Sequence, residues 1–295
     1  MALPPIEDRR LAGIGLMVAA YALFAGIDSC AKWLTLAGLP VWQVAFVRFF
    51  VHGALTLALL LPAEGPAMLR PRRPGAVALR AACLLAGTLF NFVAVQHLPL
   101  SLTATIFFAS PLAICALSVP LLGERVGPRR WAAIAVGFCG VLIATRPLGA
   151  EAHWAILCSV GAMLSASLYA ILTRRLAGVD SSGTQQIYAS LAPALAVFPF
   201  AAADWSLPVA APDWAALALV GVFGFAGHQL LTRAHRLAEA SVLAPFVYVH
   251  LAFMTLAGWA VFGEVPDAWV LAGGAVTLGS GLYLWARERR LARRD

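Results

Sequence analysis

Charged residues are scarce in this sequence. Asp, Glu, Lys and Arg make up only 12% of its 295 residues, whereas 61% of the residues are hydrophobic. Soluble domains contain about 25% charged and about 45–50% apolar residues. The scarcity of charge therefore excludes an ordinary soluble protein and predicts a polytopic integral membrane protein.

Several motifs that carry chemistry are also absent. The five cysteines lie within apolar runs and form no C-x-x-C pair, and the six histidines show no H-E-x-x-H spacing. A disulfide framework or a metal site is therefore not expected. Gly279-Ser280-Gly281 lacks the G-x-S-x-G context of a serine hydrolase. We expect no metal, no cofactor, no catalytic residues and no enzymatic activity.

Two further classes of function find no support in the sequence. No Walker A sequence G-x-x-x-x-G-K-[ST] occurs, so the chain shows no ATP-driven step. The formal net charge is +7, but the basic residues stand in short clusters between apolar runs, with no basic face interleaved with aromatic residues. We therefore expect no nucleic acid partner.

Long apolar segments fill most of the chain. A bilayer core about 30 Å thick requires roughly 20 apolar residues per helix. Proline, glycine and charged residues mark the breaks between these segments. The ten predicted spans are residues 11–33, 40–61, 76–97, 101–122, 128–146, 153–173, 183–203, 213–233, 239–262 and 266–286. We expect an all-α integral membrane protein whose surroundings are the lipid bilayer.

The basic residues predict the orientation of these spans. With the N-terminus in the cytoplasm, nearly all of the 21 Lys and Arg residues fall in inner segments, while Lys32 and Arg146 lie on the outer side and Arg48 lies within a span. Cytoplasmic loops of membrane proteins carry such an excess of Lys and Arg. We therefore expect both termini to be cytoplasmic, in a bacterial inner membrane.

A long internal repeat divides the sequence into two halves. Ser101 to Glu124 returns, at a constant offset, as Ser241 to Glu264, and each stretch begins with Ser and ends with Gly-Glu. Because each half holds five spans, an odd number, the second half must cross the membrane in the inverted direction. Inverted repeats are common in secondary transporters, which hold their substrate near the midplane. We predict two inverted five-helix repeats, residues 1–150 and 151–295.

These features resemble the drug/metabolite transporter superfamily and, within it, the ten-helix EamA-type exporters. The resemblance covers nearly the whole chain and rests on the spans, the inverted repeat and several short motifs. The motifs are Pro111 followed by Gly123-Glu124, the second Gly263-Glu264, Arg48-Phe49 in span 2, and Lys32 closing span 1. The chain departs from the pattern at Leu251, which stands at the repeat position of Pro111, with Pro245 earlier instead.

The resemblance implies alternating access around a central cavity walled by spans 1, 3, 4, 6, 8 and 9. Within the superfamily the chain most resembles the subgroup that exports aromatic amino acids, which implies a cargo of that class.

Polar and aromatic side chains within the spans are the candidates for binding cargo. Polar groups at membrane depth are costly and tend to face the protein interior. A zwitterion needs a few donors and acceptors for its head and an apolar wall for its side chain. The alternative for each residue is an interhelical hydrogen bond or simple packing. The candidate substrate-binding residues are Asn91, Phe107, Ser110, Ser165, Tyr169, Gln229, Tyr248 and His250.

Prolines and charges within the spans are expected to shape the helices. Pro111 and Pro245 each remove a backbone hydrogen bond, and the resulting kinks are either bending points for gating or static features. Asp28 and Lys32 are four residues apart and can pair on one helix face. For Arg48 the alternative to structural pairing is holding an outer gate. The expected structural charges are Asp28, Lys32, Arg48, Glu124 and Glu264.

The sequence predicts a secondary transporter that exports aromatic and other small amino acids across the inner membrane by alternating access. The alternatives are an exporter of other small metabolites or drugs and, from a different class, an intramembrane enzyme. No midplane carboxylate is evident as a counter-ion for a cationic drug, which favours a zwitterionic or neutral small-molecule substrate. Because the two halves supply the symmetry that smaller relatives obtain by dimerising, we expect a functional monomer.

Overall fold

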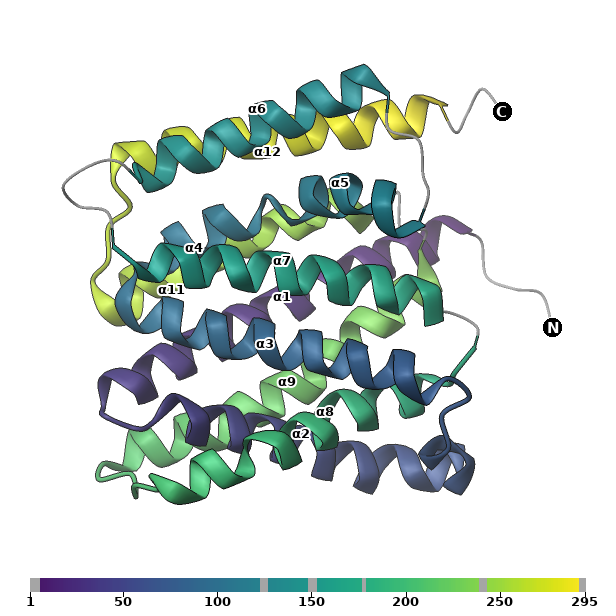
Figure 1. Ribbon diagram of the computed structural model, residues 1–295, viewed down its shortest axis with the longest axis vertical. Helices are drawn as coiled ribbons and strands as arrows, with labels where there is room; N and C mark the ends of the chain where they lie inside the picture. Colours follow the sequence, from purple (N-terminus) through teal and green to yellow (C-terminus); the bar gives the residue numbers. More distant parts are fainter. Residues whose placement is uncertain (1–5, 123–126, 148–152, 177–178, 239–242, 292–295) are drawn as a thin grey trace. The chain divides into compact units, whose positions relative to one another are not determined.

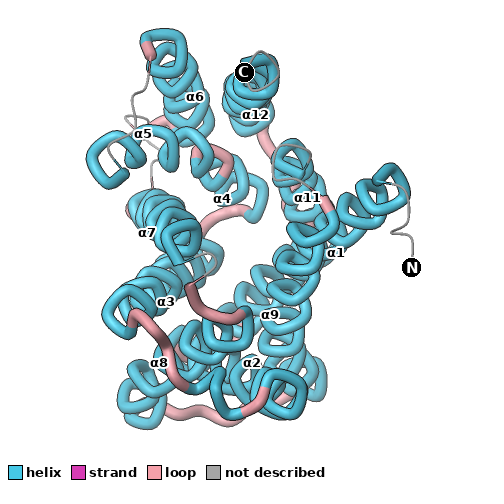
Figure 2. The backbone as a smooth tube through the Cα atoms, turned by 90° about the vertical axis from the view of Figure 1, so that its right-hand side faces the viewer, coloured by secondary structure: helices cyan, strands magenta, loops and turns pink. Residues whose placement is uncertain are grey.

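The computed structural model describes residues 6–122, 127–147, 153–176, 179–238 and 243–291, which form helices and connecting turns without any strand (Figure 2). The first half contains α1 (Ile6–Leu36), α2 (Val41–Glu64), the 3₁₀ helix η1 (Pro66–Leu69), α3 (Pro74–His97), α4 (Leu100–Phe107), α5 (Ser110–Leu122) and α6 (Pro128–Thr145). The second half contains α7 (Ala155–Leu176), α8 (Ser182–Ala203), α9 (Ala211–Leu237), the 3₁₀ helix η2 (Ala244–Tyr248), α11 (Val249–Phe262) and α12 (Ala268–Leu291).

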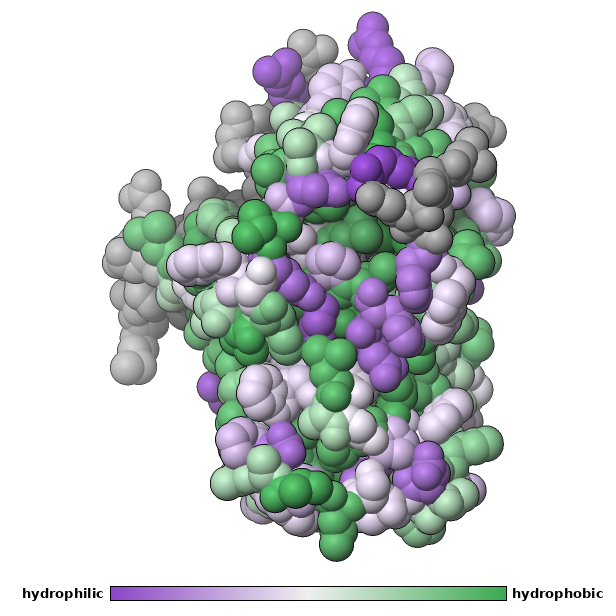
Figure 3. Space-filling view, turned by 90° about the vertical axis from the view of Figure 1, so that its left-hand side faces the viewer, coloured by the Kyte–Doolittle hydropathy of each residue, from purple (hydrophilic) through white to green (hydrophobic). Residues whose placement is uncertain are grey.

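The predicted spans are confirmed as helices. Within the described ranges, eight helical segments are long and apolar enough to cross a membrane, and Phe246–Phe262 is a shorter apolar helix. The remaining predicted span is α6, whose first turn contains two arginines. Many large apolar side chains reach the surface, such as Leu157 and Leu195, both 75% exposed (Figure 3). Exposed apolar side chains of this kind are expected where helices face lipid, and the chain is an all-α integral membrane protein.

The chain forms two compact units, each built from both halves of the sequence. Unit 1 comprises Met1–Ala25, Pro99–Ala152 and Ala226–Asp295, and unit 2 comprises Gly26–Leu98 and His153–Phe225. Helices α1 and α9 contribute residues to both units, because a boundary between the units falls inside each of these two helices. In unit 2, α3 packs along α7 and α2 packs along α8; in unit 1, α6 packs along α12 (Figure 1).

The pair of α6 and α12 in unit 1 shows how the repeat is built. Thr277 donates a hydrogen bond from Oγ1 to the carbonyl of Gly137 (3.2 Å), and Ser280 donates to the carbonyl of Ala133. Near the opposite ends of the two helices, Arg146 pairs with Asp267 at 2.8 Å. These contacts make the two helices antiparallel. Because α6 and α12 are the fifth spans of the two halves, their opposite directions are those of an inverted repeat.

The Gly-Glu motif that ends the repeated stretch has a clear structural role in the second half. Helix α11 ends at Gly263, which has the left-handed φ of 67° that favours glycine. The backbone turns there, and the N–H of Glu264 donates to the carbonyl of Gly258 at 2.9 Å. The Glu264 carboxylate then accepts a hydrogen bond from the N–H of Leu100 at 2.9 Å, at the start of α4. The equivalent Glu124 lies outside the described residues.

Spans 4 and 9, both in unit 1, are each interrupted. Helix α4 ends at Phe107 and α5 begins at Ser110, so Pro111 lies in the first turn of α5. Proline is well tolerated there, because the missing N–H would have no partner within the helix. In span 9, the 3₁₀ helix η2 contains Pro245 and is followed directly by α11. The repeat offset places both interruptions at equivalent positions.

Candidate functional site

Unit 2 contains a polar network between α1, α2 and α3. The Nδ2 of Asn91 donates to the carboxylate of Asp28 at 2.8 Å, and the Nη1 of Arg48 donates to the hydroxyl of Thr88 at 2.9 Å. Thr88 and Asn91 are three residues apart, so they lie on one face of α3. Through this face α3 holds an acidic side chain of α1 and a basic side chain of α2.

The two charges of this network are deeply buried. The exposed fraction is 9% for Asp28 and 6% for Arg48, and their charges act on one another. An isolated charge inside a membrane protein is costly, whereas two opposite charges with hydrogen-bond partners offset part of that cost. The pair is electrically neutral in total. It therefore presents both a positive and a negative group to the interior of unit 2.

A second buried basic side chain, Arg80 of α3, joins α7 and α8 in the same unit. Arg80 donates from Nε to the hydroxyl of Thr173 (2.7 Å), from Nη1 to the carbonyl of Gln185 (3.0 Å) and from Nη2 to the hydroxyl of Tyr169. Its guanidinium carbon also lies 4.3 Å from the centre of the Tyr169 ring, in cation–π contact. The predicted site residue Tyr169 is thus bound to a cation that was counted among the basic residues of the inner segments.

The sequence contains a signal that identifies Arg80 as an interior residue. Arg80, Thr88 and Asn91 are spaced so that they fall on one stripe of α3. On α2, Arg48 and His52 are one helical turn apart and so lie on one face, and His52 is 2% exposed. His52 shares a hydrogen bond of 3.1 Å with the Oε1 of Gln186 on α8, a residue that sequence reasoning also missed.

The interruptions of spans 4 and 9 face each other in unit 1. The rings of Phe108 and Tyr248, at equivalent positions of the two repeats, meet edge to face with their centres 4.9 Å apart. His250 lies beside Phe107, with ring centres 6.3 Å apart, and beside Tyr21 of α1 at 5.6 Å. The structure therefore places the predicted site residues Phe107 and His250 in one ring contact and Tyr248 in a second, with Phe108, between the same two interrupted spans.

The remaining predicted residues take separate places. In unit 1, Ser110 donates to the carbonyl of Phe107 at 2.6 Å and so stabilises the interruption of span 4. Gln229 lies on α9, and its Nε2 is buried without an acceptor among the described residues. In unit 2, Ser165 lies on α7 where that helix approaches Gly87 of α3 closely, because a Cβ added at Gly87 would lie 3.3 Å from the Cβ of Ser165.

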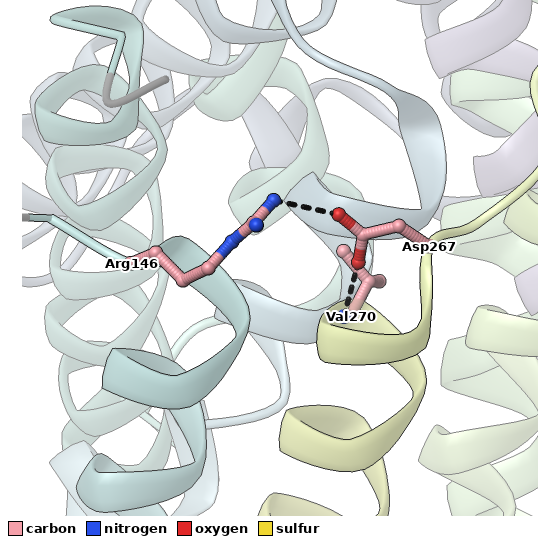
Figure 4. A network of polar contacts seen from close by, with 3 residues as sticks. All are labelled: Arg146, Asp267 and Val270. Atoms are coloured by element: carbon pink, nitrogen blue, oxygen red, sulfur yellow. Dashed lines mark hydrogen bonds and ion pairs between the residues drawn. The ribbon is translucent and has the colours of Figure 1, made fainter. Parts of the chain in front are cut away.

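The expected structural charge Lys32 bonds to backbone, and a charged pair that was not predicted joins the ends of two helices. Lys32 donates from Nζ to the carbonyl of Leu98 at 2.8 Å within unit 2. In unit 1, Arg146 and Asp267 are part exposed, and the other oxygen of Asp267 accepts from the N–H of Val270 in the first turn of α12 (Figure 4). An acidic side chain in the first turn of a helix also interacts favourably with the helix dipole.

The described residues include no candidate metal site. In the part of the chain that the structure describes, no group of three or more His, Cys, Asp or Glu side chains is placed to hold a metal ion. The five cysteines are free thiols. What the arrangement offers instead is hydrogen-bond donors and acceptors, paired charges and aromatic rings, which are groups that bind small molecules without covalent chemistry.

Comparison with known proteins agrees with this architecture. The EamA-like transporter family matches residues 11–146 and again residues 153–285. A riboflavin transporter of Vibrio cholerae is 29% identical over 98% of this chain and 98% of its own length. An S-adenosylmethionine uptake transporter of Rickettsia bellii is 26% identical over 94% of each chain, and the pseudopaline exporter CntI of Pseudomonas aeruginosa is 26% identical over 92% of this chain and 95% of its own length.

A solved crystal structure shares the fold, with a TM-score of 0.66 and 20% sequence identity over 97% of this chain and 99% of that one. The named relatives carry different cargoes, and none of them is named as an exporter of aromatic amino acids. The two family matches cover nearly the whole sequence, one in each half. This chain belongs to the EamA-like transporter family and is a multi-pass membrane transporter.

Proposed function

We propose that this transporter is a secondary carrier that exports aromatic amino acids across the bacterial inner membrane by alternating access. The observation that carries the proposal is the two ring contacts in unit 1, Phe107 with His250 and Phe108 with Tyr248, which join the two interrupted spans. Aromatic side chains favour edge-to-face or offset contacts with other rings. Interrupted helices near the midplane are also where secondary transporters commonly bind their substrates.

The charges of unit 2 support a cargo without net charge. Asp28 and Arg48 balance one another, so this pair offers no excess of either sign. A cationic drug would require an unbalanced carboxylate as its counter-ion. A zwitterionic amino acid adds no net charge and therefore suits a balanced pair better.

Riboflavin is the second candidate cargo. The observation that favours it is the similarity, over 98% of both chains, to the riboflavin transporter of Vibrio cholerae. Riboflavin also has a flat ring system that could stack in an aromatic cluster, but it lacks the carboxylate and ammonium groups of an amino acid. The relatives include both uptake transporters and an exporter, so the direction of transport is tested along with the cargo.

The test is flux into and out of liposomes that contain only this protein. Vesicles are loaded with labelled phenylalanine, labelled tryptophan or riboflavin, and efflux is followed with and without a pH gradient. Saturable efflux of both amino acids, absent from protein-free vesicles, is the expected result. Flux of riboflavin alone would assign the second candidate. No flux of any of the three would contradict the proposal, provided that the protein is shown to be folded.

Removing the Tyr248 ring tests the site. We expect Tyr248→Ala to lower phenylalanine flux at least about tenfold, because the aromatic surface proposed to contact the cargo ring is lost. The matched control is Tyr283→Ala on α12, whose side chain is 51% exposed and should matter little. Equal flux in the two variants would contradict a role for Tyr248 in binding cargo. Asn91→Ala, in unit 2, is expected to reduce flux as well.

A further inference from the structure

Two hydrogen-bond donors in the interior of unit 2 have no acceptor among the described residues. They are the Nε of Arg48 and the Nε2 of Gln186. Both side chains are only 6% exposed. Buried polar groups nearly always have a hydrogen-bond partner, and an orphaned donor on a charged group is especially costly. The two orphaned donors therefore require acceptors that the described residues do not supply.

The donors are linked through one histidine. Arg48 and His52 are one turn apart on α2, and His52 bonds to the Oε1 of Gln186 on α8 at 3.1 Å. This bond fixes the orientation of the Gln186 amide, because its oxygen is used by the histidine and its NH₂ group is left for another partner. The guanidinium of Arg48 is oriented as well, because its Nη1 donates to the hydroxyl of Thr88 at 2.9 Å.

A glycine leaves space beside these side chains. A Cβ added at Gly224 of α9 would lie 3.6 Å from the Nδ1 of His52 and 3.9 Å from the Cγ of Arg48. These are ordinary contact distances, so Gly224 lies directly beside the two residues and leaves room there for about one methyl group.

The chemistry of the donors selects the ligand. A guanidinium N–H and an amide N–H, both desolvated, match the two oxygens of a carboxylate. A simple anion would add an uncompensated negative charge beside Asp28, which is buried in the same network. A zwitterion carries its own positive charge and leaves the total unchanged.

We propose that Arg48 and Gln186 form a subsite for the carboxylate of a zwitterionic amino acid. The proposal rests on the proposed function, and it selects amino acids over riboflavin as the cargo. It also gives Arg48 a role in recognition, in place of the purely structural role expected from the sequence.

The test is ligand-induced stabilisation of the purified full-length protein in lipid nanodiscs. The thermal unfolding midpoint is measured with increasing phenylalanine, phenethylamine, which lacks the carboxylate, and riboflavin, and also with chloride exchanged for gluconate. We expect phenylalanine to raise the midpoint and phenethylamine to require at least about tenfold more ligand for the same shift. Equal shifts with phenylalanine and phenethylamine, or a shift with chloride alone, would overturn the proposal.

Gln186→Glu is the sharpest variant, because it keeps the shape of the side chain and the oxygen that bonds to His52. It replaces the orphaned donor with an acceptor that repels a carboxylate and attracts Arg48. We expect the variant to fold with unchanged or higher stability and to bind phenylalanine at least about tenfold more weakly. Arg48→Lys, which keeps the charge but cannot present Nε, should weaken binding similarly.

The matched control is Ser190→Ala on α8, which removes a buried hydroxyl that donates to the carbonyls of Gln186 and Ile187 in its own helix. Its phenylalanine shift should equal that of the unmodified protein. Unchanged binding in Gln186→Glu and Arg48→Lys would overturn the subsite even if liposome flux of phenylalanine is observed. Binding that these variants abolish, without any flux, would instead contradict the carrier and leave the subsite intact.

Discussion

Arg80 is the residue whose loss should most disturb unit 2. Its side chain is 6% exposed and donates to Thr173, to the carbonyl of Gln185 and to Tyr169. Arg80→Met keeps much of the volume but leaves these acceptors without a donor. Hydrogen bonds to a charged group contribute about 1.5–3 kcal/mol, so we expect a loss of stability of that order. Thermal unfolding in detergent measures it, with the exposed Arg73→Met as control; equal midpoints would contradict the assignment.

At the scale of residues, span length identifies which polar groups lie at membrane depth, but not which groups near the end of a span turn inward. Asn91 was predicted to face the interior, and the structure places it against Asp28. Arg80 was counted with the basic residues of the inner segments, because span length alone cannot tell whether a basic residue near a helix end turns inward or toward the lipid headgroups. Gln186 was missed for the same reason, since it lies close to the start of α8.

The close packing of α6 on α12 in unit 1 depends on glycines, which have no side chain. A Cβ added at Gly140 of α6 would lie 2.7 Å from the carbonyl oxygen of Gly273 and 2.8 Å from the N–H nitrogen of Thr277. Both are backbone atoms that cannot move aside without separating the helices. We expect Gly140→Ala to destabilise the protein by about 1–3 kcal/mol, as overpacking does elsewhere.

Gly279→Ala on α12 is the matched control for this substitution, because nothing lies within 4 Å of its added Cβ. Alanine in an open helical position should leave stability unchanged or raise it by about 0.4–1 kcal/mol. The two unfolding midpoints are compared under the same conditions. A Gly140→Ala protein as stable as Gly279→Ala would contradict the close packing of α6 on α12.

At the scale of elements, the lengths of the apolar segments predict where the helices lie, but they predict the interruptions of these helices poorly. Pro111 marks the region where span 4 is broken, but the helix ends earlier, at Phe107, and the proline lies in the turn that starts the next helix. A proline in a sequence is compatible with a kink and with a new helix start. The edge-to-face contact of Phe108 with Tyr248 is a tertiary contact, which the local sequence does not specify.

At the scale of the whole molecule, the repeat predicts the direction of the second half but not which helices pack together. Each half contributes one helix to the pairs α2 with α8 and α6 with α12. The compact units consequently combine segments from both halves and do not coincide with residues 1–150 and 151–295. A sequence repeat reflects a duplication, whereas the compact units depend on which helix faces pack together. The boundaries of the repeats and those of the units therefore need not coincide.

The membrane orientation can be tested with two single cysteines on a background in which the five native cysteines are replaced. Val209→Cys lies in the turn after α8, where the side chain is 98% exposed, and Arg73→Cys lies before α3 and is also exposed. We expect a membrane-impermeant maleimide to label Val209→Cys on intact cells, because the distribution of Lys and Arg predicts that this turn is external. Arg73→Cys should be labelled only after the membrane is permeabilised, and the cysteine-free parent not at all.

The two possible failures of this experiment have different meanings. Five predicted spans separate the two positions, an odd number, so the cysteines must lie on opposite sides of the membrane. Labelling of both from outside would contradict the number of spans and with it the inverted repeat. A reversed pattern, with Arg73→Cys labelled on intact cells, would leave the repeat intact and contradict only the cytoplasmic placement of the termini. Because the repeat and the basic residues are independent features of the sequence, the labelling tests each of them separately.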